Sequence, residues 1–330
     1  MDFHRTLMSA ALLHYRTWQG TWRRPLWSVV PIARVALVML LRRKLFWVLY
    51  GFALLLFLMF FFGSFLLDWA ETQLAATPIQ IGRLKTDPER AVRFLRQGVR
   101  VLNGSQETFA YFFSYQGAMV VVILALAGSV LVGNDFTFRS VGFYLAKPIQ
   151  PRHWIMGKCL AVGVIVHLLT TVPAMVLFAQ HGMNDWNYVV DVDYFTATGM
   201  GNGPASWLLI LGILGYGMLL ATVLSIVLVA AASWLRRTMP LILLWVSLFL
   251  FLRILATILV DGLKYDGRWR LLDLWNNLGL IGQACLGFDY GSIRPTPQPA
   301  FWEAGLALGG LCSACLISLK MRTRDVPIVR

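Results

Sequence analysis

The sequence predicts an all-α polytopic membrane protein, and its composition and the pattern of its apolar residues both lead to this fold class. Hydrophobic residues make up 58% of the 330-residue chain and charged residues 14%, whereas a soluble globular chain carries about 25% charged residues. The apolar residues are gathered into six long runs. Because lipid offers the backbone no hydrogen-bonding partner, each run is expected to form a helix.

Each of the six runs is long enough to cross a bilayer. The first, residues 45–67, contains 23 residues without a charge. At about 1.5 Å per residue, such a helix exceeds the roughly 30 Å hydrocarbon core. The fifth run contains one charge, Arg253. The predicted spans cover residues 45–67, 115–132, 159–179, 207–235, 239–260 and 301–319.

The segments between the spans differ in character. Residues 1–44 carry many charges and include the run PIARVALVMLLRRK, which has an apolar face and a basic end. Such a pattern is typical of a helix that lies in the membrane interface, and we expect it to lead into the first span through an elbow. The remaining segments are three loops on one side (68–114, 181–206 and 261–300), the connector 133–158 on the other side, and the tail 320–330.

Lys and Arg are distributed unevenly between the two sides of the predicted membrane domain. The side with both termini, residues 133–158 and the turn that contains Arg236 and Arg237 holds 18 of them, and the three loops on the opposite side hold 10. The loop 181–206 holds none. Because basic residues collect on the cytoplasmic side of spans, both termini and the connector are predicted to be cytoplasmic, and the three loops are predicted to be outer loops.

The chain shows no clustered set of catalytic residues. Its five histidines are scattered, HExxH is absent, and the Gly157–Lys158 pair lacks the rest of a phosphate-binding loop. The net charge of +13 could suggest nucleic acid, but no nucleic-acid-binding motif accompanies it. We therefore expect no catalytic residue, metal site, cofactor or nucleotide-binding domain in this chain, and no nucleic-acid partner.

One histidine and one arginine lie inside predicted spans, where ionisable groups are costly and often functional. His167, in the third span, is consistent with a helix–helix hydrogen bond or with a transport pathway. Arg253, in the fifth span, is consistent with a side chain that extends to the interface and pairs with Asp261, or with a pathway role. The sequence leaves both pairs of interpretations open.

The connector reads GNDFTFRSVGFYLAKPIQPRHWIMGK. It is too polar to cross a bilayer and too apolar for a plain linker. In chain order it presents an acidic residue, a small polar residue, an apolar patch, a proline, a basic residue and a Gly-Lys pair. These residues are Asp135, Ser140, Phe143, Tyr144, Leu145, Pro148, Arg152, Gly157 and Lys158.

This order resembles the cytoplasmic connector of ABC-2 type transporter permeases, which are transmembrane subunits of ATP-binding cassette transporters. The family pattern is roughly an acid-rich piece, Gly-Thr, a Leu-rich patch, Pro-Val/Ile-Ser-Arg and Gly-Lys. Here Arg139 stands where glycine is usual, and Ser140 replaces threonine. The six spans, the elbow-like N-terminus and the cytoplasmic termini agree with the family. The architecture is also loosely similar to permeases of multicopper-enzyme maturation systems.

The resemblance implies a non-enzymatic subunit of an exporter in a bacterial cytoplasmic (inner) membrane. The connector would form a coupling helix in a cleft of a separate ATPase subunit, which would bind ATP and Mg. Phe143, Tyr144 and Leu145 would form an apolar anchor, and Arg139 and Arg152 would supply charges at its rim. A second copy of the chain, or a sister permease, would complete the transporter among the membrane lipids.

A different class of protein competes with this interpretation. The chain could be a stand-alone membrane protein, either a secondary transporter or a scaffold of a membrane complex, without an ATPase partner. Ion-coupled carriers place ionisable residues at mid-membrane. The spans offer only His167 and Arg253, which favours the permease.

Overall fold

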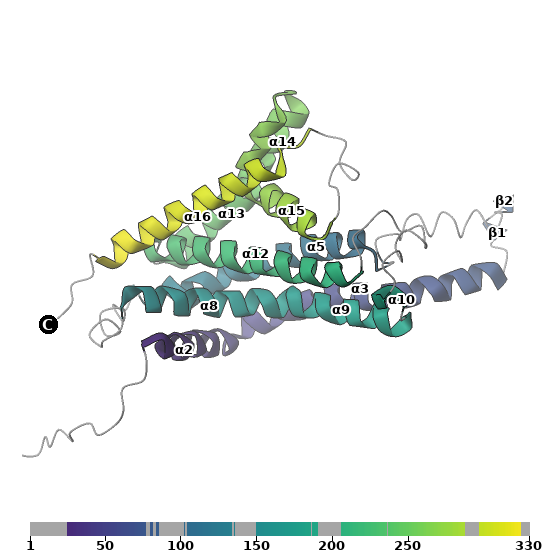
Figure 1. The fold of residues 1–330 in the computed structure, drawn as a ribbon, viewed down its shortest axis with the longest axis horizontal. Helices are drawn as coiled ribbons and strands as arrows, with labels where there is room; N and C mark the ends of the chain where they lie inside the picture. The colour runs from purple at the N-terminus through teal and green to yellow at the C-terminus, as the bar shows by residue number, and fades with distance from the viewer. Residues whose placement is uncertain are drawn as a thin grey trace, which may run out of the picture.

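The computed structural model describes most of the chain as helices (Figure 1). The described residues are 25–76, 80–81, 84–85, 102, 104–133, 135, 150–185, 187–190, 206–235, 237–287 and 297–324. Within these ranges the only strands are β1 (Gln80–Ile81) and β2 (Leu84–Lys85), which pair antiparallel. The helices are η1 (Pro25–Ser28), α2 (Val29–Leu41), α3 (Lys44–Ala76), α5 (Gln106–Gly128), η3 (Ser129–Gly133), α8 (Pro151–Leu169), α9 (Thr171–Asn184), α10 (Asn187–Val190), α12 (Ser206–Trp234), α13 (Thr238–Val246), η4 (Ser247–Phe251), α14 (Leu252–Thr257), η5 (Ile258–Gly262), η6 (Gly267–Leu272), α15 (Leu274–Cys285) and α16 (Phe301–Arg324).

Six helical stretches in the described chain are long and apolar enough to cross a membrane. This confirms the predicted fold class, an all-α polytopic membrane protein. Several stretches run beyond the predicted spans. Their bounds are Lys44–Gly63, Gln106–Gly133, Pro151–Asn184, Trp207–Trp234, Met239–Gly262 and Phe301–Arg322.

The third stretch consists of two helices, α8 and α9, that meet at Thr170. The hydroxyl of Thr170 donates to the carbonyl of Val166 at 2.7 Å, and a back-bond of this kind bends helices. Pro173 follows within the first turn of α9 and has no N–H to continue the hydrogen-bonding ladder. The span is therefore broken at Thr170, although its apolar sequence is continuous.

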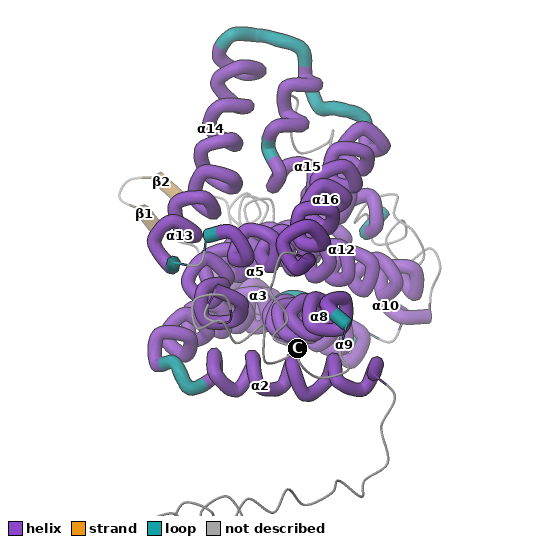
Figure 2. Tube along the Cα trace, turned by 90° about the vertical axis from the view of Figure 1, so that its left-hand side faces the viewer, coloured by secondary structure: helices purple, strands orange, loops and turns teal. Residues whose placement is uncertain are grey.

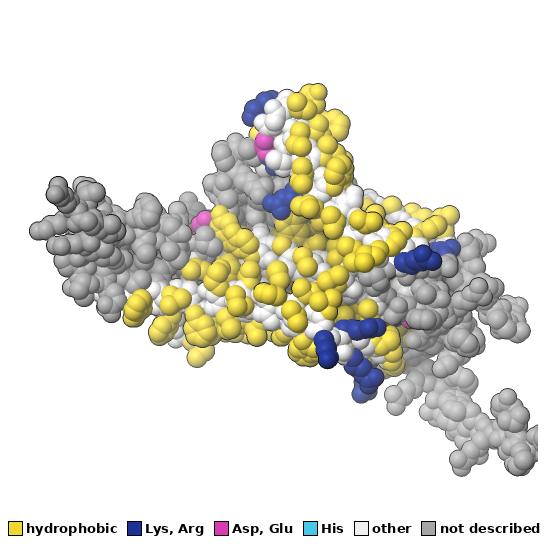
Figure 3. Space-filling view, turned by 180° about the vertical axis from the view of Figure 1, so that it is seen from behind, with side chains coloured by type: hydrophobic (Ala, Val, Ile, Leu, Met, Phe, Trp, Pro, Cys, Tyr) yellow, Lys and Arg dark blue, Asp and Glu magenta, His cyan; other side chains and the backbone are white. Residues whose placement is uncertain are grey.

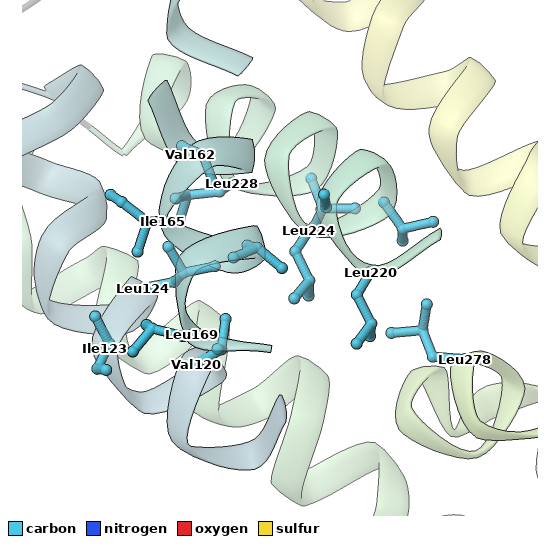
Figure 4. Packing of buried hydrophobic residues seen from close by; sticks show 14 of the residues in the cluster. Val120, Ile123, Leu124, Val162, Ile165, Leu169, Leu220, Leu224, Leu228 and Leu278 are labelled. Carbon is cyan, nitrogen blue, oxygen red and sulfur yellow. The ribbon is translucent and has the colours of Figure 1, made fainter. Parts of the chain in front are cut away.

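The core lies where α5, α8 and α12 meet (Figure 4). Each helix contributes apolar residues three, four or seven positions apart, which places them on one face. These residues are Val120, Ile123 and Leu124 from α5, Val162, Ile165 and Leu169 from α8, and Leu220, Leu224 and Leu228 from α12. Leu278 of α15 packs beside them.

Glycines on α12 allow two other elements to approach closely. A Cβ atom at Gly212 would meet the backbone carbonyl of Cys285, and one at Gly217 would meet the hydroxyl of Thr171. Small residues permit such close packing in membranes. These two glycines of the fourth span therefore serve close contact between elements.

Polar side chains hold the first span, α3, against the bundle. Gln116 of α5 donates to the carbonyl of Ala53 at 3.2 Å, and Gln180 of α9 donates to the carbonyl of Phe61 at 2.7 Å. Much of the α3 surface is otherwise exposed and apolar. Interhelical hydrogen bonds of this kind help to associate helices in lipid, where the hydrophobic effect does not act between them.

The α14 end of the fifth span projects away from the central bundle, whereas α2 packs against it (Figure 2). In the end-on view, α2 lies beside α8 on one side, and α14 and α16 lie on the opposite side (Figure 2). The stretch from α13 to η5 contains two π-helical turns, η4 and η5. Apolar side chains cover much of the exposed surface (Figure 3), as expected for helices that face lipid.

Candidate functional site

Much of the connector between the second and third spans lies outside the described residues. Residues 134 and 136–149 are not described, so Arg139, Ser140, Phe143, Tyr144, Leu145 and Pro148 remain sequence-based predictions. The described parts are the two ends of the connector. Asp135 follows η3, and residues 150–158 include the first two turns of α8.

The helix α8 begins before the predicted start of the third span at residue 159. Pro151 occupies its first position, where its missing N–H costs nothing and its fixed φ suits a helix. The backbone N–H of Gln150 donates to Nδ1 of the buried His153 at 3.3 Å. Arg152, Gly157 and Lys158 are therefore helical residues at the base of this span.

A buried ion pair joins the two ends of the connector. The ammonium of Lys158 lies 2.8 Å from Oδ2 of Asp135 and donates to the carbonyl of Leu131 at 2.6 Å. The indole N–H of Trp154 donates to the same carboxylate at 3.2 Å, and the Trp154 ring lies 6.0 Å from the ammonium. We call Asp135, Trp154 and Lys158 the connector clip.

The connector clip is almost completely shielded from solvent. Lys158 is 1% exposed, Asp135 is 5% exposed and Trp154 is fully buried. A buried charge is stable only when it is paired and its hydrogen-bonding groups are satisfied. The Asp135 carboxylate pairs with the Lys158 ammonium, and the Trp154 indole donates one hydrogen bond to that carboxylate. Together these contacts fix the end of η3 against the start of α8.

The helix α2 packs against the same region of α8. A Cβ atom at Gly157 would lie 2.8 Å from Cβ of Ile32 and 3.1 Å from the carbonyl oxygen of Val29. Only glycine leaves room for this contact. The opposite face of α2 exposes Arg34 and Val35, a composition suited to a membrane interface; the position of α2 as an interfacial elbow stays a prediction.

Arg152 lies outside the connector clip. Its side chain is exposed, whereas Lys158, two turns further along α8, is buried. Sequence reasoning grouped both residues with one coupling surface. In the structure Lys158 is an internal residue that ties two spans together, and Arg152 alone of the two is accessible to another molecule.

His167 makes its hydrogen bond within its own span. Its Nδ1 lies 2.9 Å from the hydroxyl of Thr171, one turn along and across the break at Thr170. The bond joins α8 to α9 within one predicted span, because the break places a hydroxyl within reach on the same chain segment. The pathway interpretation of His167 stays a prediction. The close approach of Gly217 to Thr171 brings α12 to this point.

Arg253 does not pair with Asp261, so this part of one interpretation was wrong. The extension of its side chain to the interface and the pathway role stay predictions. Asp261 accepts two hydrogen bonds from Nη2 of the buried Arg270, at 2.7 and 2.9 Å. Arg270 is nearer because η6 folds back toward the end of η5. Arg253 instead lines a cavity of about 260 Å³ between α5, α14 and α15.

Sequence reasoning missed three participants in these sites. Trp154 belongs to the connector clip, and Asn276 and Gln283 line the cavity. Trp154 lies one turn before Lys158, a spacing that could have placed both on one helix face. The part of the chain that is described contains no group of three His, Cys, Asp or Glu side chains arranged to hold a metal ion.

Comparisons with known proteins add no family assignment. No protein-family model matches the chain, and no significant match to a curated protein was found. The fold itself defines the class: six apolar helical stretches make the chain a multi-pass, all-α membrane protein.

Proposed function

We propose that this chain is the permease subunit of an ATP-binding cassette exporter, driven by a separate ATPase that binds the connector. The chain would act as a homodimer or with a sister permease in a bacterial cytoplasmic membrane, with both termini in the cytoplasm. The observation that supports the proposal most is the connector clip. In the sequence, its residues flank the segment that the sequence pattern assigns to ATPase binding.

The connector clip suits a coupling element for a mechanical reason. A displacement of the connector reaches two spans, since Asp135 follows η3 and Lys158 lies on α8. Close-packed protein interiors transmit strain, and the buried ion pair ties the end of the second span to the start of the third.

The packing of α2 supports the same mechanism. Ile32 of α2 is seated against Gly157, one residue before Lys158. A movement at the base of α8 would therefore carry α2 with it. The interfacial helix, the connector and two spans would respond to ATP binding as one unit.

The test is co-purification of the chain with the products of its neighbouring genes in mild detergent. We expect an ATPase to remain bound to the wild type. Changing Phe143, Tyr144 and Leu145 to Ala removes the apolar anchor, the kind of residue that dominates interface energetics. We expect this variant to retain less than about one tenth of the ATPase, since truncating such anchors costs 2 kcal/mol or more.

The control is Arg152→Ala, which removes an exposed rim charge and is expected to change ATPase recovery by less than about fivefold. If the folded wild-type chain retains no ATPase, the permease proposal fails. The chain would then be assigned to stand-alone membrane proteins. Size-exclusion chromatography of each variant shows whether it is folded.

Cys285 tests the orientation of the chain. The other three cysteines lie in candidate spans, so a membrane-impermeant maleimide applied to spheroplasts should label Cys285 alone. Burial raises the pKa of the Cys285 thiol. Because the thiolate is the nucleophile, labelling should be slow at neutral pH and still accelerate above pH 9. Cys285→Ser should remove the signal. Labelling that appears only after lysis would mean that Cys285 lies on the cytoplasmic side, opposite to the predicted orientation.

A further inference from the structure

The turn between α2 and α3 carries three consecutive cations, which we call the basic turn. Arg42 and Arg43 follow the last residue of α2, and Lys44 is the first residue of α3. All three side chains are exposed, and the ion pairs among the described residues involve none of them. Adjacent like charges repel one another, so an anionic partner would stabilise the basic turn.

Hydrogen bonds fix the backbone of the basic turn. The N–H of Arg43 donates to the carbonyl of Leu40 at 2.9 Å. The indole N–H of Trp47 donates to the carbonyl of Leu41 at 2.8 Å, so a side chain from the first turn of α3 satisfies one of the last carbonyls of α2. The three cations therefore stand on a corner of defined shape, at the point where the first candidate span begins.

The helix α2 runs across the central bundle. In the end-on view α8 is seen down its axis, whereas α2 is seen from the side (Figure 2). The contact with Gly157 places α2 near the start of α8, and a helix that runs across the spans at their base lies along the membrane surface. One face of α2 is buried against the bundle, and its residues recur at helical spacing: Val29, Ile32, Ala33, Ala36 and Leu40.

The surface next to the basic turn is mostly apolar. Arg34 is the only charged residue of α2, and it is exposed. In Figure 3 a group of Lys and Arg side chains borders exposed apolar side chains. A nucleic acid or an acidic protein surface would offer these apolar side chains only polar neighbours, whereas a phospholipid carries acyl chains beside its charged headgroup. The exposed apolar residues of α2 and of the first turn of α3 are Val30, Val35, Val38, Leu41, Leu45 and Trp47.

We propose that the basic turn binds the headgroups of anionic phospholipids at the membrane surface, with Arg34 as a fourth cation. The guanidinium groups of Arg42 and Arg43 bind phosphate oxygens, a geometry for which arginine is well suited. The acyl chains lie against the exposed apolar face of α2 and the first turn of α3. Clusters of about four or more Lys and Arg residues next to a span are typical of anionic-lipid recognition. The inference concerns lipid binding alone and is independent of an ATPase partner.

The experiment uses the full-length purified chain in neutral detergent. Phosphatidylglycerol and phosphatidylcholine with the same acyl chains are titrated, and bound lipid is counted by native mass spectrometry. Choline cancels the charge of the phosphate, so we expect phosphatidylglycerol to bind about tenfold more tightly. This preference should shrink as the ionic strength is raised, because exposed charges are screened. Free glycerol phosphate should bind at least about tenfold more weakly than phosphatidylglycerol, because it lacks the acyl chains.

A double variant tests the basic turn directly. Arg42→Gln combined with Arg43→Gln removes two cations and keeps two polar side chains of similar shape. It should weaken binding of phosphatidylglycerol about tenfold or more, since each cation near an anionic lipid surface contributes a several-fold gain. Binding of phosphatidylcholine should change by less than about twofold. Because both arginines are exposed and the described residues offer them no ion pair, the melting temperature should stay close to that of the wild type.

The matched control is Lys264→Gln combined with Arg268→Gln, which removes the same charge at two exposed positions away from the basic turn. This variant should bind phosphatidylglycerol as the wild type does. Equal binding of the two lipids to the wild type would overturn the proposal, as would unchanged binding of phosphatidylglycerol by the double variant of the basic turn. An equal loss in the control would show that net charge alone attracts the lipid. Binding of free glycerol phosphate as tightly as the lipid would show a phosphate site without a role for the apolar face.

Discussion

Asp135→Asn is expected to lower the free energy of unfolding by about 3–5 kcal/mol, because it leaves the buried ammonium of Lys158 without its counter-charge. The pair is 2.8 Å long, and both side chains are at least 90% shielded. The amide can still accept the hydrogen bond from Trp154, so the variant isolates the charge. Unfolding of the purified protein by a denaturing detergent in mixed micelles measures the effect.

The control is Asp135→Asn combined with Lys158→Met, in which neither charge remains. Replacing both members of a buried pair by neutral groups is often close to neutral, so the double variant should recover much of the lost stability. If it is as unstable as the sum of the two single variants, the pair makes no coupled contribution. Such additivity would contradict the geometry of the connector clip.

The same variants separate ATPase binding from coupling, if the proposed function holds. The apolar anchor Phe143–Leu145 is unchanged in them, so the ATPase should still co-purify. Lipid or another transported substrate should stimulate ATP hydrolysis less in these variants than in the wild type. The reason is that the connector is no longer fixed to both η3 and α8. Loss of ATPase binding instead would place the residues of the clip in the interface itself.

The fold class was predictable because it depends on composition and apolar run length. Lipid admits few backbone structures, so a charge-free stretch such as residues 45–67 leaves little choice. Span ends were harder to predict. The helix α8 begins at Pro151 because a proline favours the first helical turn, yet the polar residues that follow resemble a connector. Apolar content alone does not show that a residue such as Lys158 is buried.

The polar sites were predictable only as a set of candidate residues. Asp135 and Lys158 both appeared in the sequence pattern, but they lie 23 positions apart in the chain. Their pairing depends on how η3 and α8 meet. The pairing of Arg253 with Asp261 was one of two interpretations, based on the position of Arg253 toward the outer end of the span. The actual partner, Arg270, reaches Asp261 through the turn that carries η6. Asn276 and Gln283 lack any local signal, since a cavity arises from several elements at once.

Gly157→Ala is expected to lower the free energy of unfolding by about 1–3 kcal/mol, the usual cost of overpacking a close contact. The added methyl group would lie 2.8 Å from Cβ and Cγ2 of Ile32 and 3.1 Å from the carbonyl oxygen of Val29. A rotamer change cannot relieve these contacts, because a backbone atom and a Cβ atom are involved. The helix α2 must therefore move away from α8.

Gly163→Ala on the same helix is the matched control. Its added methyl group would meet only Cβ of Ala221 at 3.9 Å, an ordinary contact. Because alanine favours helices over glycine by about 1 kcal/mol, this variant should be as stable as the wild type or more so. Equal stability of both variants would mean that α2 is not seated against Gly157.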